Sequence, residues 1–332
     1  MNTIKFEPVW MPKTETHDVE KYSIKQMEIA GKKRYVYSNV GLTIYVTNRC
    51  NSDCSFCMNK FEENFLCSKE IMDDEEYLRR LDYILGLLKP LNPSVMITGG
   101  EPTKARRLPE VIKLVHKYGY VLRSFSTNGT GLLDFIDGKM ILQYMYENNF
   151  LNNINISRHA ISPEENYRIM KTKGDLINSQ LCEIAGFCAG HNMRVRMGCT
   201  LQKGGVSNLE EMLQYYSHYE SLGIDTVVFR ELIPIDTSKK GADDYQKLFV
   251  DISEILDAIR KRADFRYAYT LDGLYYNVEH FHYHDKLVKC YREKNTASPD
   301  IIRDLIFYAD GRLVDTNWND VSKTLLDYER RA

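Results

Sequence analysis

Short apolar or β-branched runs alternate along the chain with longer segments whose apolar residues recur at helical spacing. The short runs predict strands at 42–47, 94–98, 121–127, 153–158, 194–201 and 226–231. The periodic segments predict helices at 73–88, 108–118, 139–148, 175–191 and 208–222. This alternation is typical of parallel strands joined by crossover helices, either as an open doubly wound sheet or as a TIM-type barrel. We expect an α/β fold built as a partial (β/α)6 TIM-type barrel.

The pattern divides the chain into three regions. Residues 1–40 read as an N-terminal β-rich lead-in that is too short for a core of its own. The alternating part, 41–240, is the expected core barrel. Beyond it, 241–332 opens with a predicted helix at 245–262 and continues through a segment rich in Tyr and His. We expect this last region to be a C-terminal extension that covers the substrate.

Composition excludes several function classes. The 332 residues are 43% hydrophobic and 27% charged, as in ordinary globular proteins. The formal net charge of −2 gives no electrostatic footprint for nucleic acid or an anionic membrane. No apolar run reaches the roughly 20 residues of a membrane span, and the first residues lack the apolar core of a signal peptide. We therefore expect a cytoplasmic protein with neither nucleic acid nor membrane as a partner.

Three of the eight cysteines form a tight cluster. Cys50, Cys54 and Cys57 follow the first predicted barrel strand with C-x3-C-x2-C spacing, at the strand end where α/β folds build active sites. In a reducing compartment such a cluster indicates metal or catalysis. Three thiolates can hold a [4Fe-4S] cube and leave one iron open. The alternative, a structural zinc site, needs a fourth ligand such as Cys67 or a distant His.

Further motifs make the sequence similar to a known family. C-x3-C-x-aromatic-C, with Phe56 as the aromatic residue, is followed by TGGEPT, STNGT, NISRHA, RMGCTL and FRELIP at the ends of successive predicted strands. In this order the motifs resemble the radical S-adenosylmethionine (radical SAM) superfamily over about residues 41–235. The resemblance implies a [4Fe-4S] cluster and S-adenosyl-L-methionine (SAM) as cofactors. It also implies a 5′-deoxyadenosyl radical that takes hydrogen from the substrate, and a low-potential electron donor such as flavodoxin or ferredoxin.

The resemblance also suggests cofactor contacts. Gly99 and Gly100, helped by the Glu101 carboxylate, are expected to pair with the methionine ammonium group of SAM, although a GG pair alone can be a tight turn. The remaining cofactor candidates are Phe56 beside the adenine, Asn128 at the ribose or substrate, Ser157 with Arg158 at the ribose or carboxylate, Arg196 at the SAM carboxylate, and Ile233 against the adenine. For Ser157 and Arg158 the alternative is a strand end that meets water, and for Ile233 it is plain core.

The barrel motifs most resemble the GTP 3′,8-cyclase branch, and the departures from that branch are informative. Thr43 and Met96 stand where that enzyme has basic residues for its triphosphate, and only Cys290 lies beyond residue 199, where the branch has three cysteines for a second cluster. We therefore expect one cluster and a different reaction.

Other residues are candidates for substrate contact or hydrogen donation. Thr127, Tyr275 and Tyr276 can line a substrate pocket, with cleft filling as the alternative. Cys199 and Cys290 are possible hydrogen donors, although a buried cysteine is usually inert packing. The alternating His280, His282 and His284 are expected to share one face of a strand and to form an exposed or substrate-facing strand edge rather than a metal site.

Three functions compete. The leading one is a radical SAM enzyme acting on a small molecule of specialised metabolism. The second is the same chemistry on a ribosomally made peptide, by crosslinking or epimerisation. The third is a non-catalytic metal-binding module, which predicts no SAM binding and no need for Glu101.

Overall fold

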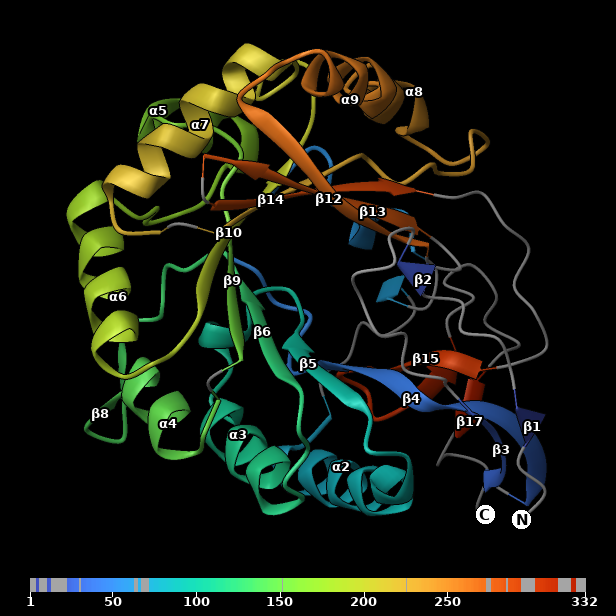
Figure 1. Cartoon of the computed structure of the whole chain (residues 1–332). Coiled ribbons are helices and arrows are strands. Elements are labelled where there is room, and N and C mark those ends of the chain that lie inside the picture. The colour runs from blue at the N-terminus through green and yellow to red at the C-terminus, as the bar shows by residue number, and fades with distance from the viewer. Residues whose placement is uncertain are drawn as a thin grey trace.

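The computed structural model describes residues 4–5, 11–12, 23–29, 31–62, 65–66, 72–150, 152–224, 226–272, 276–284, 286–293, 302–315 and 324–326. Most described strands join one sheet in the order β17, β16, β15, β4, β5, β6, β9, β10, β11, β14, β13, β12 and β2, with β3 on β4 and β1 on β3. Figure 1 shows that this sheet curves, with the helices on its outer side.

The strands of the sheet are β1 (Ile4–Lys5), β2 (Met11–Pro12), β3 (Ser23–Ile29), β4 (Lys32–Tyr45), β5 (Ser94–Thr98), β6 (Arg123–Thr127), β9 (Asn153–Ser157), β10 (Val195–Thr200), β11 (Val227–Arg230), β12 (Phe265–Asp272), β13 (Tyr276–Tyr283), β14 (Lys286–Glu293), β15 (Ile302–Phe307), β16 (Leu313–Asp315) and β17 (Thr324–Leu326). A separate hairpin consists of β7 (Phe135–Ile136) and β8 (Lys139–Met140).

The helices are α2 (Asp74–Leu88), α3 (Leu108–Lys117), α4 (Ile141–Glu147), α5 (Pro163–Met170), α6 (Asn178–Gly190), α7 (Leu209–Ser221), α8 (Ala242–Gln246) and α9 (Ile252–Arg260), with the short 3-10 turns η1 (Met58–Lys60), η2 (Lys89–Leu91) and η3 (Pro102–Lys104). Within the described residues, no helix is both long and apolar enough to cross a membrane.

The central strands form a barrel wall with one apolar and one polar face. β4, β5, β6, β9, β10 and β11 are each parallel to the next. In β5 and β9 every second residue is buried, namely Val95, Ile97, Ile154 and Ile156, and these belong to the core shared with the helices. The intervening side chains are only half-buried and line the inner face. The expected α/β partial barrel is thus confirmed, with all six predicted strands present.

The C-terminal region extends the barrel wall at both edges. β14 adds to β11 and β15 adds to β4, both in parallel, while β13 and β12 follow β14 as antiparallel strands. The extension therefore contributes inner-face side chains of its own. The boundary between barrel and extension near residue 240 stays a prediction. The lead-in is likewise continuous with the barrel, because β4 begins at Lys32, pairs with β3 and then runs on beside β5.

Two helical details differ from the sequence pattern. The single helix expected at 245–262 is divided into α8 and α9, and Asp251 caps α9 by accepting a hydrogen bond from the Ser253 backbone N–H. The pattern also missed α5, which Ser162 caps and Pro163 opens. Its eight residues are too few to show a clear helical period.

Candidate active site

The clustered cysteines lie on the loop after β4, residues 48–57, which we call the cysteine loop. Cys50 is exposed, Cys54 and Cys57 are half-buried, and all three are free thiols. The loop tightens at its end, where the Cys57 backbone N–H donates to the Cys54 carbonyl over 3.3 Å. As predicted from the pattern, this loop is at the carboxyl end of the first barrel strand.

The thiols lie close enough to influence one another. Burial raises the pKa of Cys54 to about 12, and the negative charges of Cys57 and Cys50 act in the same direction. Burial also raises the pKa of Cys50, and the Glu101 carboxylate raises it further. Cationic irons offset both effects, because metal binding stabilises thiolates. The donor set therefore fits an iron-sulfur cluster.

Within the described part of the chain, no three His, Cys, Asp or Glu side chains meet as ligands of a single metal ion. A cubic cluster does not require such a meeting point, because each thiolate binds a different iron.

The two glycines after β5 pack under the start of the cysteine loop. Gly99 has a φ of +151°, and a Cβ on it would lie 2.4 Å from the Thr47 carbonyl oxygen. A Cβ on Gly100 would lie 2.2 Å from the Arg49 carbonyl oxygen. The Gly100 and Glu101 backbone N–H groups donate to the Thr47 and Arg49 carbonyls over 2.7 and 2.8 Å. The close approach that requires glycine here is therefore made by the chain itself.

The Glu101 carboxylate joins the ends of β5 and β6. It is 1% exposed and accepts from the hydroxyls of Thr103 and Thr127, each over 2.6 Å. Its second oxygen accepts from the Asn128 backbone N–H over 2.7 Å. Burial raises the pKa of Glu101, and these hydrogen bonds oppose the rise. Since the Thr127 hydroxyl is bonded here, the structure gives its predicted substrate role no support.

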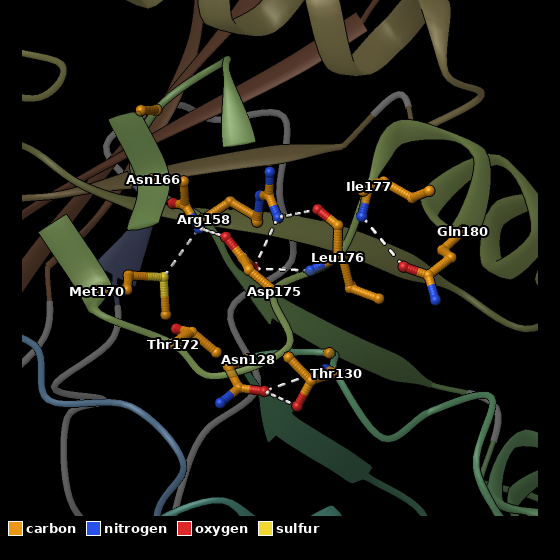
Figure 2. Close-up of polar contacts among 12 residues, drawn as sticks. Asn128, Thr130, Arg158, Asn166, Met170, Thr172, Asp175, Leu176, Ile177 and Gln180 are labelled. Carbon is orange, nitrogen blue, oxygen red and sulfur yellow. Dashed lines mark hydrogen bonds and ion pairs between the residues drawn. The ribbon is translucent and has the colours of Figure 1, made fainter. Parts of the chain in front are cut away.

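Asn128 connects β6 to the cysteine loop. Its side-chain amide N–H groups donate to Asn51 Oδ1 over 2.7 Å and to the Ser52 hydroxyl over 3.0 Å. Its Oδ1 accepts from the Thr130 backbone N–H and hydroxyl, and Figure 2 shows this turn. Asn128 was predicted at the cofactor, and these contacts make it an anchor of the loop that carries the cysteines.

Arg158 was expected to contact the cofactor, but the structure places its side chain elsewhere. Its side chain is fully buried, and Nη1 lies 3.0 Å from Asp175 Oδ1 and 2.8 Å from the Leu176 carbonyl oxygen (Figure 2). Its Nε lies 3.4 Å from the Tyr219 hydroxyl. A guanidinium with these partners is engaged within the protein, so the structure does not support a SAM contact. Ser157, the last residue of β9, is half-buried on the inner face.

Phe56 lies where the cysteine loop meets two apolar clusters. One contains Leu232 and Tyr245 and the other contains Met170. The Phe56 ring also packs edge-on against His159, with 4.4 Å between ring centroids. Next to the first cluster, the Ile233 carbonyl accepts from the Tyr245 hydroxyl over 2.9 Å. Phe56 and Ile233 are thus brought to the same side of the barrel mouth.

The inner face carries a group of cations that the sequence only half revealed. Arg196 donates from Nε to Asn155 Oδ1 on neighbouring β9. Lys289 pairs with Val228 of β11 and lies between the buried Val288 and Cys290, so its side chain points to the opposite, inner face. Burial lowers the pKa of Lys289, and the guanidinium groups of Arg196 and Arg194 lower it further. The alternation of apolar and polar residues around Lys289 was the sequence signal that could have placed its side chain on the inner face.

The candidate hydrogen donors lie on the other face of the wall. Cys199 and Cys290 are fully buried in the core that the helices share. Burial raises the pKa of Cys199 well above its usual value and that of Cys290 to about 12. Both thiols thus point away from the inner face, and the structure does not support either as a donor.

The remaining candidates lie on or next to β13. Tyr275, and the side chain of Tyr276, are outside the described residues. His280 stacks on Tyr269 of β12 with 4.1 Å between ring centroids. It pairs with Lys289 across the strands, and His282 pairs with Leu287. His280 and His282 therefore share the inner face, as their alternation predicted, whereas His284 is exposed with a φ of +49° beyond the strand. The prediction of a strand edge was wrong, because β13 pairs with a strand on each side and His280 is buried.

Comparisons with known proteins give one family. The model of the Radical SAM superfamily matches residues 44–181. A probable GTP 3′,8-cyclase of Saccharolobus islandicus is 30% identical over 237 residues, which are 69% of this chain and 70% of that protein. The GTP 3′,8-cyclase of Aquifex aeolicus is 29% identical over 226 residues, covering 68% of this chain and 65% of that protein. Among solved structures, Streptococcus suis SuiB bound to precursor peptide SuiA aligns at 15% identity with a TM-score of 0.48, over 68% of this chain and 46% of SuiB.

Proposed function

The chain belongs to the radical SAM superfamily, and from that premise we propose that it removes a hydrogen atom from an anionic small molecule bound inside its barrel. Its cofactors are those of the superfamily, a [4Fe-4S] cluster and SAM. When bound, they supply a 5′-deoxyadenosyl radical by reductive cleavage of SAM. The observation that carries the proposal is the meeting of the cysteine loop with the glycine turn after β5.

The chain's own residues have distinct roles in this proposal. Cys50, Cys54 and Cys57 hold three irons and leave the fourth for SAM. The turn at Gly99 and Gly100 would receive the methionine end, with the Glu101 carboxylate holding that turn to Thr127 and Asn128. Phe56 and Ile233 would flank the adenine. Ser157 reaches the ribose from the inner face. An electron comes from a low-potential donor such as flavodoxin or ferredoxin.

The inner-face cations support an anionic substrate. Arg196, Arg194 and Lys289 are close enough for the two guanidinium groups to lower the pKa of the lysine. Three cationic side chains that face the same interior give it a positive potential, which attracts an anionic group. We therefore assign the carboxylate or phosphate group of the substrate to Arg196 and Lys289, whereas the sequence alone suggested Arg196 for the SAM carboxylate.

We do not assign the cyclisation of GTP that the relatives' names describe. The inner-face positions of Thr43 and Met96 lack basic side chains. The only cysteine beyond residue 199 is Cys290, whose thiol faces the helices. We expect GTP to remain unchanged in an assay that contains reductant and SAM.

The cluster assignment is tested with purified protein reconstituted anaerobically with iron and sulfide. Wild type should assemble an oxygen-sensitive cluster and form 5′-deoxyadenosine from SAM and dithionite, whereas Cys54→Ala should form none. Cys182→Ala is the control, because Cys182 is exposed on α6 outside the loop. Wild-type protein without cluster or 5′-deoxyadenosine would favour the non-catalytic metal module.

The substrate assignment is tested separately with Lys289→Gln. SAM cleavage without substrate should stay at the wild-type level, because the cysteine loop is intact. Deuterium transfer from anionic candidate molecules into 5′-deoxyadenosine should fall about ten-fold, since a charged hydrogen bond contributes roughly 1.5 kcal/mol or more. Equal transfer in both proteins, or transfer from a peptide alone, would refute the anionic small-molecule assignment.

A further inference from the structure

The cysteine loop is bonded at Asn51, Ser52 and Asp53 to a segment, residues 170–173, that consists of the last residue of α5 and the three irregular residues after it. The Asp53 backbone N–H donates to the Met170 carbonyl over 2.9 Å. Asn51 and Lys173 exchange two hydrogen bonds, one from the Lys173 backbone N–H over 2.8 Å and one from the Asn51 side chain over 2.9 Å. The hydroxyls of Ser52 and Thr172 lie 2.7 Å apart. The position of the loop is therefore tied to the position of this segment.

Beyond Met170, which ends α5, segment 170–173 has no helix or strand to hold it. Lys171 adopts a left-handed conformation with a φ of +49°, and Gly174 follows with a φ of +70°. Such a stretch keeps one shape only when side chains fix its ends. One end is the last turn of α5, and the other is Asp175.

A buried polar group fixes both ends at once. Asp175 Oδ1 lies 3.0 Å from Arg158 Nη1, and its Oδ2 accepts from Asn166 Nδ2 over 2.8 Å. Asn166 lies on α5, is fully buried, and accepts from the His159 backbone N–H over 2.8 Å. Figure 2 shows Arg158, Asn166 and Asp175 together, with Thr172 of the segment below them. Asp175 is thereby joined to the end of β9 and to α5.

Stabilisation of the fold alone does not explain the group formed by Arg158, Asp175 and Asn166. Burying an ion pair costs desolvation energy, which its attraction often only balances, and Arg158 Nη2 remains buried without a hydrogen-bond partner. Its geometric effect is clear, because it holds the segment to which the cysteine loop is bonded. Outer contacts of this kind orient metal ligands.

We propose that Arg158, Asp175 and Asn166 are positioning residues that hold the cysteine loop in its cluster-binding shape through segment 170–173, in which Thr172 makes the side-chain contact to the loop. This inference rests on the proposed cluster at Cys50, Cys54 and Cys57. It gives Arg158 a role in the radical SAM reaction that does not require contact with SAM.

The experiment compares iron retention in four proteins reconstituted alongside wild type: Asp175→Asn, Thr172→Val, Thr172→Ser and Asp74→Asn. Thr172→Ser keeps the hydroxyl for Ser52, whereas Thr172→Val removes it and keeps the shape. Asp74→Asn is the control for loss of a carboxylate next to a buried arginine, because Asp74 Oδ1 lies 3.4 Å from Nε of Arg107, although the Asp74 side chain is itself exposed. Iron release to a chelator and the EPR spectrum of the reduced cluster with SAM are measured, together with thermal unfolding.

Asp175→Asn and Thr172→Val should release iron about ten-fold faster than wild type and change the spectrum with SAM. Thr172→Ser should restore the wild-type behaviour, and Asp74→Asn should match wild type in both. Wild-type iron retention in Asp175→Asn and Thr172→Val would overturn the inference, as would equal loss in Asp74→Asn. If Asp175→Asn does not fold, the Thr172 pair decides. Absence of a cluster in wild type would instead contradict the proposed function.

Discussion

At the scale of single residues, burial has a clear effect on the pKa of the Glu62 carboxyl group. Glu62 follows η1, just beyond the cysteine loop, and is 2% exposed. The Tyr308 hydroxyl donates to its Oε1, and its Oε2 is buried without a hydrogen-bond partner. Burial raises the pKa of Glu62 from 4.5 to about 7, against the opposing effects of Tyr308, Arg312 and Lys239. This carboxyl group therefore changes its charge near neutral pH.

Glu62→Gln should flatten the dependence of stability on pH. Because the pKa is higher in the folded than in the unfolded protein, the folded chain binds more protons between about pH 4.5 and 7. Wild-type stability should therefore fall across this window, by on the order of 3 kcal/mol from Glu62, and then level off. In urea unfolding at pH 5 to 8, the free energy of unfolding of the variant should fall less with rising pH, because the contribution of Glu62 is removed. Burial also raises the pKa of Glu293 to about 7, so the variant keeps the part of the pH dependence that Glu293 contributes. Identical profiles would contradict this account.

At the scale of elements, amphipathic helices close the outer face of the wall. α9 shows this clearly, because Ile252, Ile255, Leu256 and Ile259 are buried while the residues between them are not. Asp251 caps its start and Arg260 lies in its last turn, where it also pairs with Glu279 of β13. The helix is held by the apolar stripe rather than by its surface charges.

Leu256→Ala should destabilise the protein by about 2–5 kcal/mol, because the side chain is fully buried and its removal leaves a cavity. Asp257→Ala, on the exposed side of the same helix, should change the free energy of unfolding by less than about 0.5 kcal/mol. Denaturant unfolding of the two variants measures both effects. Similar values for the two would show that α9 does not pack as described.

At the scale of the whole molecule, the C-terminal strands complete the barrel wall. β15 covers the edge of β4, and Tyr308 just beyond it packs on Tyr45 with 5.2 Å between ring centroids. β14 brings Lys289 to the inner face at the other edge. The extension therefore packs beside the end of β4, which leads into the cysteine loop, at one edge of the wall and contributes to the proposed substrate site at the other.

Deletion of residues 302–332 should expose the edge of β4 and uncover Tyr45. An unpaired strand edge with apolar neighbours promotes association between chains. We expect the shortened protein to elute as oligomers or aggregate in size-exclusion chromatography and to be cleaved faster by protease. A monomer that retains iron like the full chain would show that β15 is dispensable.

Much of the fold followed from patterns that act locally. The six barrel strands and the main helices were predictable because apolar residues repeat with the period of the element that buries them. The cysteine spacing and TGGEPT identified the superfamily and hence the cofactors, because a few backbone-critical residues in a fixed order suffice for that.

The tertiary structure decided which polar groups meet, because such contacts join residues far apart in the chain. The sequence could not show that Arg158 pairs with Asp175, that Lys289 joins Arg196 on the inner face, or that Tyr308 reaches Glu62. Strand alternation tells which face a side chain takes, but only strand order and register determine its neighbours on that face. The sequence by itself thus determined the fold class and the chemistry of the cofactors, while the folded chain determined which side chains position the cysteine loop.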